Sequence, residues 1–310
     1  MKTILITGCA GFIGSALTNF LLDQNYKLIG LDDLSTGSKK NLPKNRNFKF
    51  FKGNCNNLKI LKKIKKYKIS IIIHLAGQSS GEKSFFNPLN DFERNLLSTV
   101  NLLNFYLENK SKHFIYASSM SVYGNVNKQV KENNKCNPIS FYGLAKFSSE
   151  KYIEMFAKKK VNYTILRLFN VYGAGQNLNN LQQGMVRIYL TQILKKKKLN
   201  IKGSLLRYRD FIYISDVINV IKKIINNKKC YNKIFNVGYG KKYKISKLIQ
   251  TIQKKIPFKF NIKQTFGTPL DQFGIYSNNS KLKKVLRYNP SIDLSEGLDK
   301  FIKHLKNNEK

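Results

Sequence analysis

Several residue types are scarce in this chain of 310 residues, and each shortage excludes a class of protein. There is no tryptophan, and there are only four cysteines and three histidines. These residues are Cys9, Cys55, Cys136, Cys230, His74, His113 and His304. Their scattered positions lack the spacing of metal ligands, and a disulfide framework is not expected at this chain length. The sequence therefore predicts no metal site, and His74 is interpreted as a packed or hydrogen-bonded residue.

Long apolar runs are also missing. No stretch reaches eighteen apolar residues, the length that a membrane-spanning helix needs. No signal peptide is recognised, because the first expected strand leads directly into a glycine-rich loop. We expect a cytoplasmic protein without a membrane partner.

Acidic side chains are few, at 17 against 56 lysines and arginines, which gives a formal net charge of +39. Such a charge would ordinarily suggest a polyanionic partner. Here the lysines are spread along the whole chain beside abundant asparagine and isoleucine, which indicates a compositional bias. No specific nucleic-acid partner is predicted, although the charge should attract small anions.

Apolar runs recur at the spacing of a protein in which strands alternate with helices. The expected strands are residues 2–6, 26–31, 48–52, 69–75, 113–118, 163–169 and 233–237. This alternation is typical of a parallel sheet covered on both faces, with ligands beyond the carboxyl ends of the strands. We predict an α/β fold, a Rossmann doubly wound sheet with a smaller C-terminal α/β substrate lobe. The first domain would span residues 1–172, with a return at about 210–238, and residues 173–209 and 239–310 would form the second lobe.

The first expected strand runs into a glycine motif, Thr7-Gly8-Cys9-Ala10-Gly11-Phe12-Ile13-Gly14. Gly8 would supply a tight turn, and Gly11 would let the backbone approach a pyrophosphate. Gly14 would let the following helix, residues 15–23, pack closely on the sheet and present its N–H groups to the phosphates. This context favours a dinucleotide site over a plain tight turn.

Asp32 and Asp33 end the second expected strand, roughly twenty residues beyond the glycines. A carboxylate at this point can bond both hydroxyls of an adenosine ribose, and it would repel the 2′-phosphate of NADP. The sequence therefore predicts NAD as the cofactor. The alternative is that the two acids cap a helix or turn.

Tyr142 and Lys146 stand four residues apart in an expected helix, so they share one face. A positive charge favours a phenolate, so we expect Lys146 to lower the pKa of Tyr142 from about 10 toward neutrality. Such a pair can form an acid/base centre. In a chain this rich in lysine, an ordinary amphipathic helix is the alternative.

A series of motifs resembles the extended short-chain dehydrogenase/reductases, and among them the NAD-dependent nucleotide-sugar epimerase/dehydratase family. The motifs are the glycine loop, Asp32, residues 74–77, Asn95, residues 118–124, Tyr142-x-x-x-Lys146, and residues 166–173 and 209–213. They cover nearly the whole chain, and the resemblance is strongest to 4-epimerases of the UDP-glucose type. It implies a homodimer through the helix after Asn95 and the helix that bears Tyr142. It also implies that NAD is bound by Gly8, Gly11, Phe12, Ile13, Gly14, Asp32, Asn54, Cys55, Leu75, Ala76, Gly77, Asn95, Tyr142 and Lys146.

The resemblance implies that Ser119, Tyr142 and Lys146 are the catalytic residues of an enzyme that inverts C4 of a nucleotide-bound hexose. Tyr142, directly or through Ser119, would remove the C4 hydroxyl proton while a transient 4-keto sugar forms beside tightly bound NAD. The family's 4,6-dehydratases carry an Asp-Glu pair where this chain has Met120 and Ser121. The prediction is an NAD-dependent nucleotide-sugar 4-epimerase. Dehydration, reduction or epimerisation at another carbon is the alternative, and a non-catalytic nucleotide-sensing or nucleic-acid-binding protein is a more distant one.

For the substrate, the resemblance implies a nucleotide sugar, with a UDP-sugar favoured. It would be bound by Ser119, Ser121, Tyr142, Asn170, Arg209 and Asp271. Arg209 can make a bidentate contact with a diphosphate. The chain departs from these epimerases at Thr268, where a second diphosphate-binding arginine often stands, and at Lys202, where an aromatic residue often lies beside the base. These departures leave the base and the sugar open.

Overall fold

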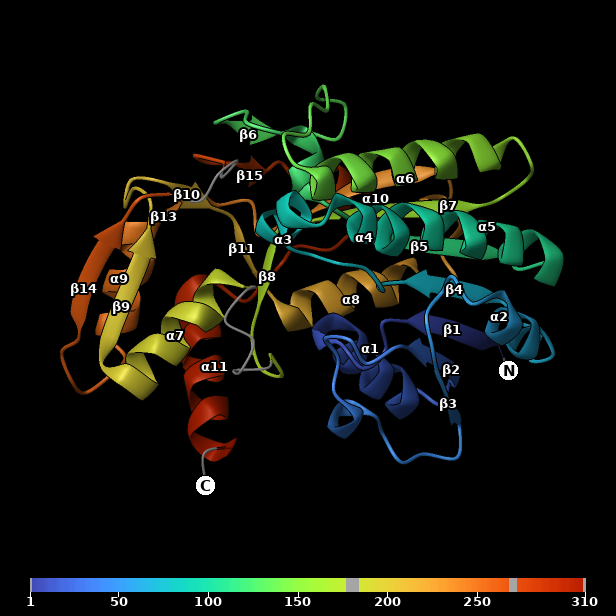
Figure 1. Ribbon diagram of the computed structural model, residues 1–310, viewed down its shortest axis with the longest axis horizontal. Coiled ribbons are helices and arrows are strands. Elements are labelled where there is room, and N and C mark those ends of the chain that lie inside the picture. The colour runs from blue at the N-terminus through green and yellow to red at the C-terminus, as the bar shows by residue number, and fades with distance from the viewer. Residues whose placement is uncertain (1, 177–183, 268–271, 309–310) are drawn as a thin grey trace.

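The computed structural model describes residues 2–176, 184–267 and 272–308, and within them a seven-stranded parallel sheet forms the centre (Figure 1). Its strands in spatial order are β3 (Phe48–Lys52), β2 (Lys27–Asp32), β1 (Thr3–Thr7), β4 (Ile71–His74), β5 (His113–Ser119), β7 (Tyr163–Leu168) and β12 (Lys233–Val237). Every neighbouring pair is parallel. The order reverses between β1 and β4, the switch point at which open α/β sheets bind their ligands. The predicted Rossmann sheet is confirmed.

The side chains of β1 show how the sheet is buried on both faces. Ile4 and Ile6 join a core with Leu17 of α1 (Phe12–Asp23), while Leu5 joins a separate core with Leu102 of α5 (Ser98–Asn109). Successive side chains of a strand point to opposite faces, so an unbroken apolar run fits this position. Helix α8 (Ile214–Ile224) lies beside α1 on one face of the sheet. Helices α2 (Leu58–Lys65) and α6 (Phe141–Ala157) flank α5 on the other face (Figure 1).

Helix α1 begins at Phe12, earlier than the predicted residue 15. The reason lies at Gly11, whose backbone is extended (φ −78°, ψ 178°) and which serves as the N-cap. Within the described part of the chain, no side chain caps this helix. The first turn of α1 therefore belongs to the glycine loop itself.

A group of helices and strands from the second half of the sequence lies at one end of the central sheet, at the left of Figure 1. They are α7 (Met185–Lys196), β9 (Lys198–Lys202), β10 (Tyr208–Arg209), β13 (Tyr243–Lys244), α9 (Ile245–Gln253), β14 (Asn261–Thr265) and α11 (Leu294–Asn308). Strand β9 pairs with β14, and β10 pairs with β13. Between them the chain returns to the main sheet through α8 and β12. We propose that the two parts are domains with the boundaries expected from the sequence.

Short elements complete the chain. They are α3 (Gly81–Phe86), α4 (Pro88–Asp91), a π-helical turn (Phe92–Leu97), β6 (Gln129–Val130), β8 (Asn170–Tyr172), β11 (Phe211–Tyr213), β15 (Tyr276–Ser277), α10 (Ser280–Leu286) and 3₁₀ turns at Lys39–Asn41, Met120–Tyr123 and Lys228–Cys230. Among the described residues, no helix combines the length and apolarity needed to cross a membrane.

Candidate functional site

A cavity of about 440 Å³ lies at the carboxyl ends of the central strands and extends to the start of α7. The predicted site residues that line it are Gly8, Gly11, Phe12, Ile13, Gly14, Asp32, Asn54, Cys55, Leu75, Ala76, Gly77, Ser119, Ser121, Tyr142, Lys146 and Asn170. Asn95 and Arg209 are buried but do not line it, and Asp271 lies outside the described residues. One cavity thus joins the glycine loop to the Tyr142 helix.

The glycine loop has the close contacts that its sequence predicts. Gly8 has a φ of +72°, and a Cβ there would lie 2.7 Å from the backbone nitrogen of Ala76. A Cβ on Gly14 would lie 1.9 Å from the carbonyl oxygen of Gly8. Both positions therefore require glycine, and the loop stays close to the sheet. The uncapped first turn of α1 faces the cavity through Phe12 and Ile13, which suits a diphosphate.

Asp32 is held at the end of β2 by two backbone N–H groups. Ala10 and Leu34 donate to its carboxyl oxygens at 2.9 and 2.8 Å. Burial raises the pKa of Asp32, and these hydrogen bonds oppose the shift. The acid therefore ties the glycine loop to β2 and still faces the cavity, where an adenosine ribose would lie.

Asp33 forms an ion pair with Arg94, 2.9 Å apart, that sequence reasoning missed. Burial alone would raise the pKa of Asp33, but hydrogen bonds from Ser35 and Arg94 hold it below its ordinary value. Arg94 comes from the π-helical turn, far from Asp33 in sequence, so no local pattern indicates the pair. The glycines, the uncapped helix and the two acids together fit a dinucleotide.

His74 has a structural position, as predicted. Its ring nitrogens lie 2.7 Å from the hydroxyl of Thr7 and 3.2 Å from that of Thr99. Burial lowers the pKa of His74 to about 3. The imidazole is therefore neutral and fixed between β1 and α5.

Ser119, Tyr142 and Lys146 reach the cavity from two elements. Ser119 ends β5, and its hydroxyl accepts a hydrogen bond from the backbone of Ser121 at 3.2 Å. Helix α6 starts just before Tyr142, because the hydroxyl of Ser140 caps it through the N–H of Gly143 at 3.1 Å. The cap places Tyr142 in the first turn, with Lys146 one turn further on.

The Lys146 ammonium hydrogen-bonds to the backbone rather than to the phenol oxygen of Tyr142. It donates to the carbonyl oxygen of Ala117 at 3.0 Å and lies 4.9 Å from the ring centre of Tyr116. Its distance from the ring centre of Tyr142 is 6.0 Å. The two side chains share a helix face as expected, but they are not in direct polar contact.

The expected lowering of the Tyr142 pKa is wrong for this arrangement. Burial raises the pKa of Tyr142 to about 12, a hydrogen bond with Ser119 opposes this, and the charge of Asp91 adds to it. Burial also lowers the pKa of Lys146 to about 8, against the charges of Asp91 and Glu150. Sequence reasoning considered only the attraction between the two heads and omitted the removal of both from water.

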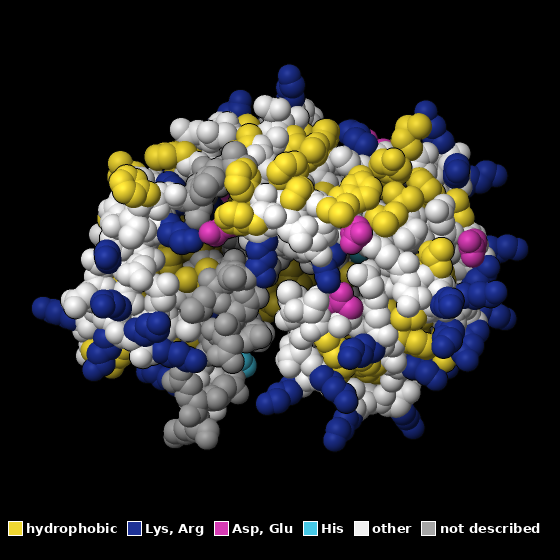
Figure 2. All heavy atoms as spheres, in the orientation of Figure 1, with side chains coloured by type: hydrophobic (Ala, Val, Ile, Leu, Met, Phe, Trp, Pro, Cys, Tyr) yellow, Lys and Arg dark blue, Asp and Glu magenta, His cyan; other side chains and the backbone are white. Residues whose placement is uncertain are grey.

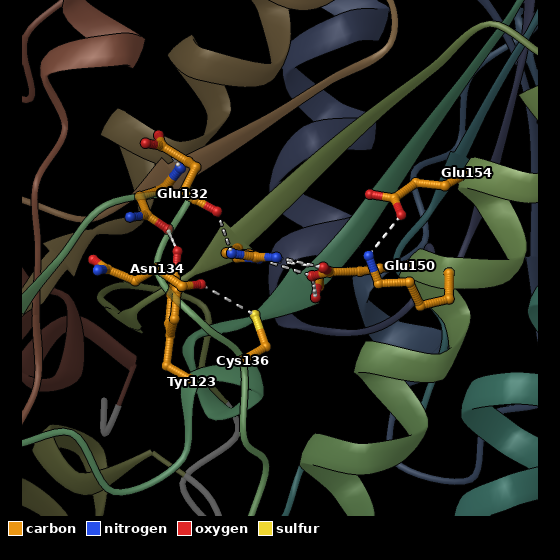
Figure 3. Close-up of polar contacts among 10 residues, drawn as sticks. Tyr123, Glu132, Asn134, Cys136, Glu150 and Glu154 are labelled. Carbon is orange, nitrogen blue, oxygen red and sulfur yellow. Dashed lines mark hydrogen bonds and ion pairs between the residues drawn. The ribbon is translucent and has the colours of Figure 1, made fainter.

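A buried polar cluster lies behind the site. Glu150, one turn after Lys146 on α6, accepts hydrogen bonds from Arg167 of β7 and from Ser118 of β5. Figure 3 shows Glu150 pointing from α6 toward the loop that carries Glu132. Burial would lower the pKa of Arg167, but the bonds and charge of Glu150 raise it. The cluster fixes α6 against β5 and β7, and with it the position of Lys146.

Two further residues near the site were not predicted. Asp91, at the end of α4, is buried beside Asn95 and interacts electrostatically with Lys146. Arg187, in the first turn of α7, is buried and lines the cavity, and burial lowers its pKa to about 10. Asp91 could have been found from its position one helical turn before Asn95. Arg187 has no comparable signal.

The predicted substrate residues are only partly brought together. Asn170 lines the cavity, and its amide donates to the carbonyl oxygen of Asp210 at 3.2 Å. Arg209 donates to the carbonyl oxygens of Tyr208 and Phe273, at 2.8 and 3.2 Å. Lys202 is exposed and pairs with Glu82 of α3 at 3.1 Å, which joins the second lobe to the first.

The chain is similar to known proteins in both sequence and fold. The sequence profile of the NAD dependent epimerase/dehydratase family matches residues 4–238. A relative from Methanocaldococcus jannaschii, named "Putative UDP-glucose 4-epimerase", is 34% identical over 310 residues, which is 99% of each chain. The structure of a UDP-glucose 4-epimerase with UDP-glucose from Thermotoga maritima aligns over 100% of both chains with a TM-score of 0.95 and 29% identity. A UDP-glucuronic acid 4-epimerase from Bacillus cereus, solved with UDP-glucuronic acid and NAD, covers 99% of this chain and 100% of its own, with a TM-score of 0.91 and 28% identity.

Proposed function

Because this chain belongs to the NAD dependent epimerase/dehydratase family, whose cofactor is NAD, we propose that it is a nucleotide-sugar 4-epimerase acting on a UDP-hexose. One observation carries this proposal. Ser119, Tyr142 and Lys146 line the same cavity as the glycine loop. The positions after Ser119 hold Met120 and Ser121, so the pair of acids that dehydration needs is absent there.

The residues that line the cavity indicate which groups would hold each part of NAD. The glycine loop and the first turn of α1 would bind the diphosphate, and Asp32 would bind the adenosine ribose. Tyr142 and Lys146 would bind the nicotinamide ribose. Bound NAD⁺ supplies the hydride acceptor and a positive charge that favours the phenolate of Tyr142.

Proton movement at the sugar is the task of the protein's own side chains. Tyr142 would take the proton of the C4 hydroxyl, either directly or through the Ser119 hydroxyl, which lines the same cavity. Burial keeps the phenol of Tyr142 protonated, so the proposed step requires Lys146 to act on it as a cation, a contact that the described arrangement does not make. Inversion would follow from return of the hydride to the other face of C4, with the proton returned to the C4 oxygen by the same side chains.

We propose that the nucleotide sugar lies between the catalytic residues and the second lobe. Ser121 and Asn170 line this part of the cavity, and Arg209 would have to leave its carbonyl partners to reach a diphosphate. The family resemblance alone supports Asp271 as a residue that binds the nucleotide. Relatives solved with UDP-glucose and with UDP-glucuronic acid support a UDP-sugar as the substrate, but they do not indicate which sugar it carries. A cytoplasmic location is inferred from NAD and the nucleotide substrate.

The protein is also proposed to be a homodimer. Large apolar side chains are exposed on α3, α4, the π-helical turn and α6, and we call this surface the apolar face. Its residues are Phe85, Phe86, Leu89, Phe92, Leu97, Phe141, Leu144, Tyr152 and Met155. Figure 2 shows hydrophobic side chains gathered where Figure 1 places α4 and α6. A second copy of the chain would cover this face. The face includes α6, one of the two helices expected at the interface. Its other residues precede α5, the second expected helix, in the sequence.

The reaction can be tested with a panel of UDP-, GDP-, CDP- and dTDP-sugars incubated with the protein in D₂O and followed by NMR. Inversion at C4 without deuterium uptake is the expected result. Deuterium incorporation with loss of the 6-hydroxyl would show a dehydratase instead. A purified protein with no bound NAD and no conversion of any sugar would overturn the proposal.

A further inference from the structure

The carboxyl group of Asp91 is buried and only half satisfied by hydrogen bonds. Its side chain is 1% exposed. The amides of Gln78 and Asn95 donate to Oδ1, at 2.8 and 3.1 Å. Among the described residues, the second oxygen, Oδ2, has no hydrogen-bond partner. Neither oxygen accepts from a backbone N–H group in these contacts, so Asp91 does not act as a helix cap.

The ammonium of Lys146 lies on the same side of Gly77 as the Asn95 side chain. A Cβ on Gly77 would lie 2.5 Å from Asn95 Oδ1 and 3.4 Å from Lys146 Nζ. Asn95 Oδ1 also lacks a donor within the described part of the chain. Lys146 Nζ donates to the carbonyl oxygen of Ala117 and, among the described residues, makes neither a hydrogen bond nor a close ion pair with Asp91, so the two charges act on each other through space.

We infer that Asp91 is the counter-ion of Lys146, a positioning residue that keeps the ammonium charged and directs it toward the cavity floor. A buried carboxylate without a partner charge is unfavourable. Lys146 is the cation whose charge stabilises the ionised form of Asp91, and the stabilisation is mutual. This role rests on the proposed function, in which Lys146 must act as a cation beside Tyr142.

The other charged and titratable groups around the pair do not replace Asp91. On α6, Glu150 also acts on Lys146, but it is already paired with Arg167. His74 on β4 is neutral, since burial lowers its pKa. The other titratable groups on α6 and on the elements around it are Tyr142, Lys151, Tyr152 and Glu154 on α6, Tyr106 and Glu108 on α5, His113 and Tyr116 on β5, Tyr123 on the 3₁₀ turn, Tyr163 on β7, Glu82 and Lys83 on α3, and Glu93 and Arg94 on the π-helical turn.

The titration of Lys146 tests the inference without any turnover. Protein labelled with ¹³C at lysine Cε is titrated by NMR, and the Lys146 signal is the one lost in Lys146→Arg. In Asp91→Asn, which keeps the shape and removes the charge, the midpoint of Lys146 should fall by about one pH unit or more. Asp23→Asn, the same change at an exposed position on α1, should leave it unchanged.

The unaltered protein provides a second measurement if Asp91→Asn and a smaller variant, Asp91→Ser, do not fold. Burial raises the pKa of Asp91 to about 6, so the Lys146 signal should also respond in that range. Absence of that response, or an unchanged midpoint in folded Asp91→Asn, would overturn the inference. If sugar turnover is present, its alkaline limb should move to lower pH in Asp91→Asn, whereas a purely structural role would lower turnover equally at every pH. A shifted Lys146 in a protein without epimerase activity would reject the proposed function alone.

Discussion

Arg167 and Glu150 face each other inside the protein as a two-pronged ion pair. The Nε and Nη2 atoms of Arg167 lie 2.7–3.3 Å from the carboxylate oxygens of Glu150, and the two side chains are 3% and 0% exposed. The pair joins β7 to α6, the helix that carries Tyr142 and Lys146. The stability that this ion pair contributes should therefore also affect how firmly the catalytic residues are held.

Removal of one partner should be costly, since it leaves the other charge buried. Glu150→Ala is expected to lower the free energy of unfolding by about 3–5 kcal/mol, measured by urea denaturation. The control is Lys151→Ala, which breaks the exposed Lys151–Glu154 pair in Figure 3 and should cost less than about 1 kcal/mol. Equal effects of the two substitutions would contradict the structural role of the buried pair.

Tyr142→Phe removes the phenol oxygen and keeps the ring. If Tyr142 transfers the C4 proton, sugar turnover should fall by roughly 10²–10⁴-fold while bound NAD is retained. The comparison is Tyr152→Phe, the same change on the exposed side of the same helix, which should leave initial rates unchanged. Normal turnover by Tyr142→Phe would remove it from the acid/base role.

Gly14→Ala should disrupt the cofactor loop, because the new Cβ would lie 1.9 Å from the Gly8 carbonyl oxygen. We expect protein that either fails to fold or contains little NAD, measured after acid release of the nucleotide. Gly267→Ala is the matched control, since among the described residues its Cβ would meet nothing nearer than 3.7 Å. A full NAD content in Gly14→Ala would mean that the loop tolerates movement away from the sheet.

A charge placed in the apolar face should prevent self-association. Met155→Glu and Leu144→Glu are expected to convert a dimer into a monomer, as measured by light scattering after size-exclusion chromatography. Leu58→Glu, at another exposed apolar position on α2, should have no such effect. A monomeric unaltered protein, or dimers that survive both substitutions, would contradict the homodimer.

Acid should destabilise the fold through His74. The folded pKa is lowered to about 3 by burial, so below about pH 6.5 the unfolded chain binds a proton that the folded chain does not. Stability from this residue is therefore present at neutral pH and lost as pH falls, by about 1.4 kcal/mol per unit. His74→Asn should remove that slope in urea unfolding measured between pH 7 and pH 5. An unchanged slope would show that the imidazole is reached by solvent.

The fold was predictable because its signals are local. Strands β3 and β12, the two edge strands of the sheet, match their predicted bounds, because a short apolar run marks each of them in the sequence. The glycine loop was predictable for the same reason, because a backbone turn of that kind leaves few residue choices. Asn170 and Ser119 were placed correctly at the cavity because parallel strands end at one edge.

The electrostatics of the site were not predictable. The ion pairs Asp33–Arg94 and Lys202–Glu82 join residues far apart in sequence, so no spacing rule indicates them. The direction of the Tyr142 pKa shift was missed because sequence spacing reports proximity and says nothing of burial. Arg209 shows the same limit, since its place in the motif does not tell which way its guanidinium points.

Strand β12 has a consequence for biosynthesis. It pairs with β7, although the chain between them, from residue 169 to 232, builds other elements first. Until that segment has emerged from the ribosome, β7 is an open edge of unpaired N–H and C=O groups, the surface at which nascent chains aggregate. A fragment that ends at residue 172 would keep this edge permanently. The cofactor-binding half is therefore not a separable module, because its sheet is complete only when β12 has paired with β7.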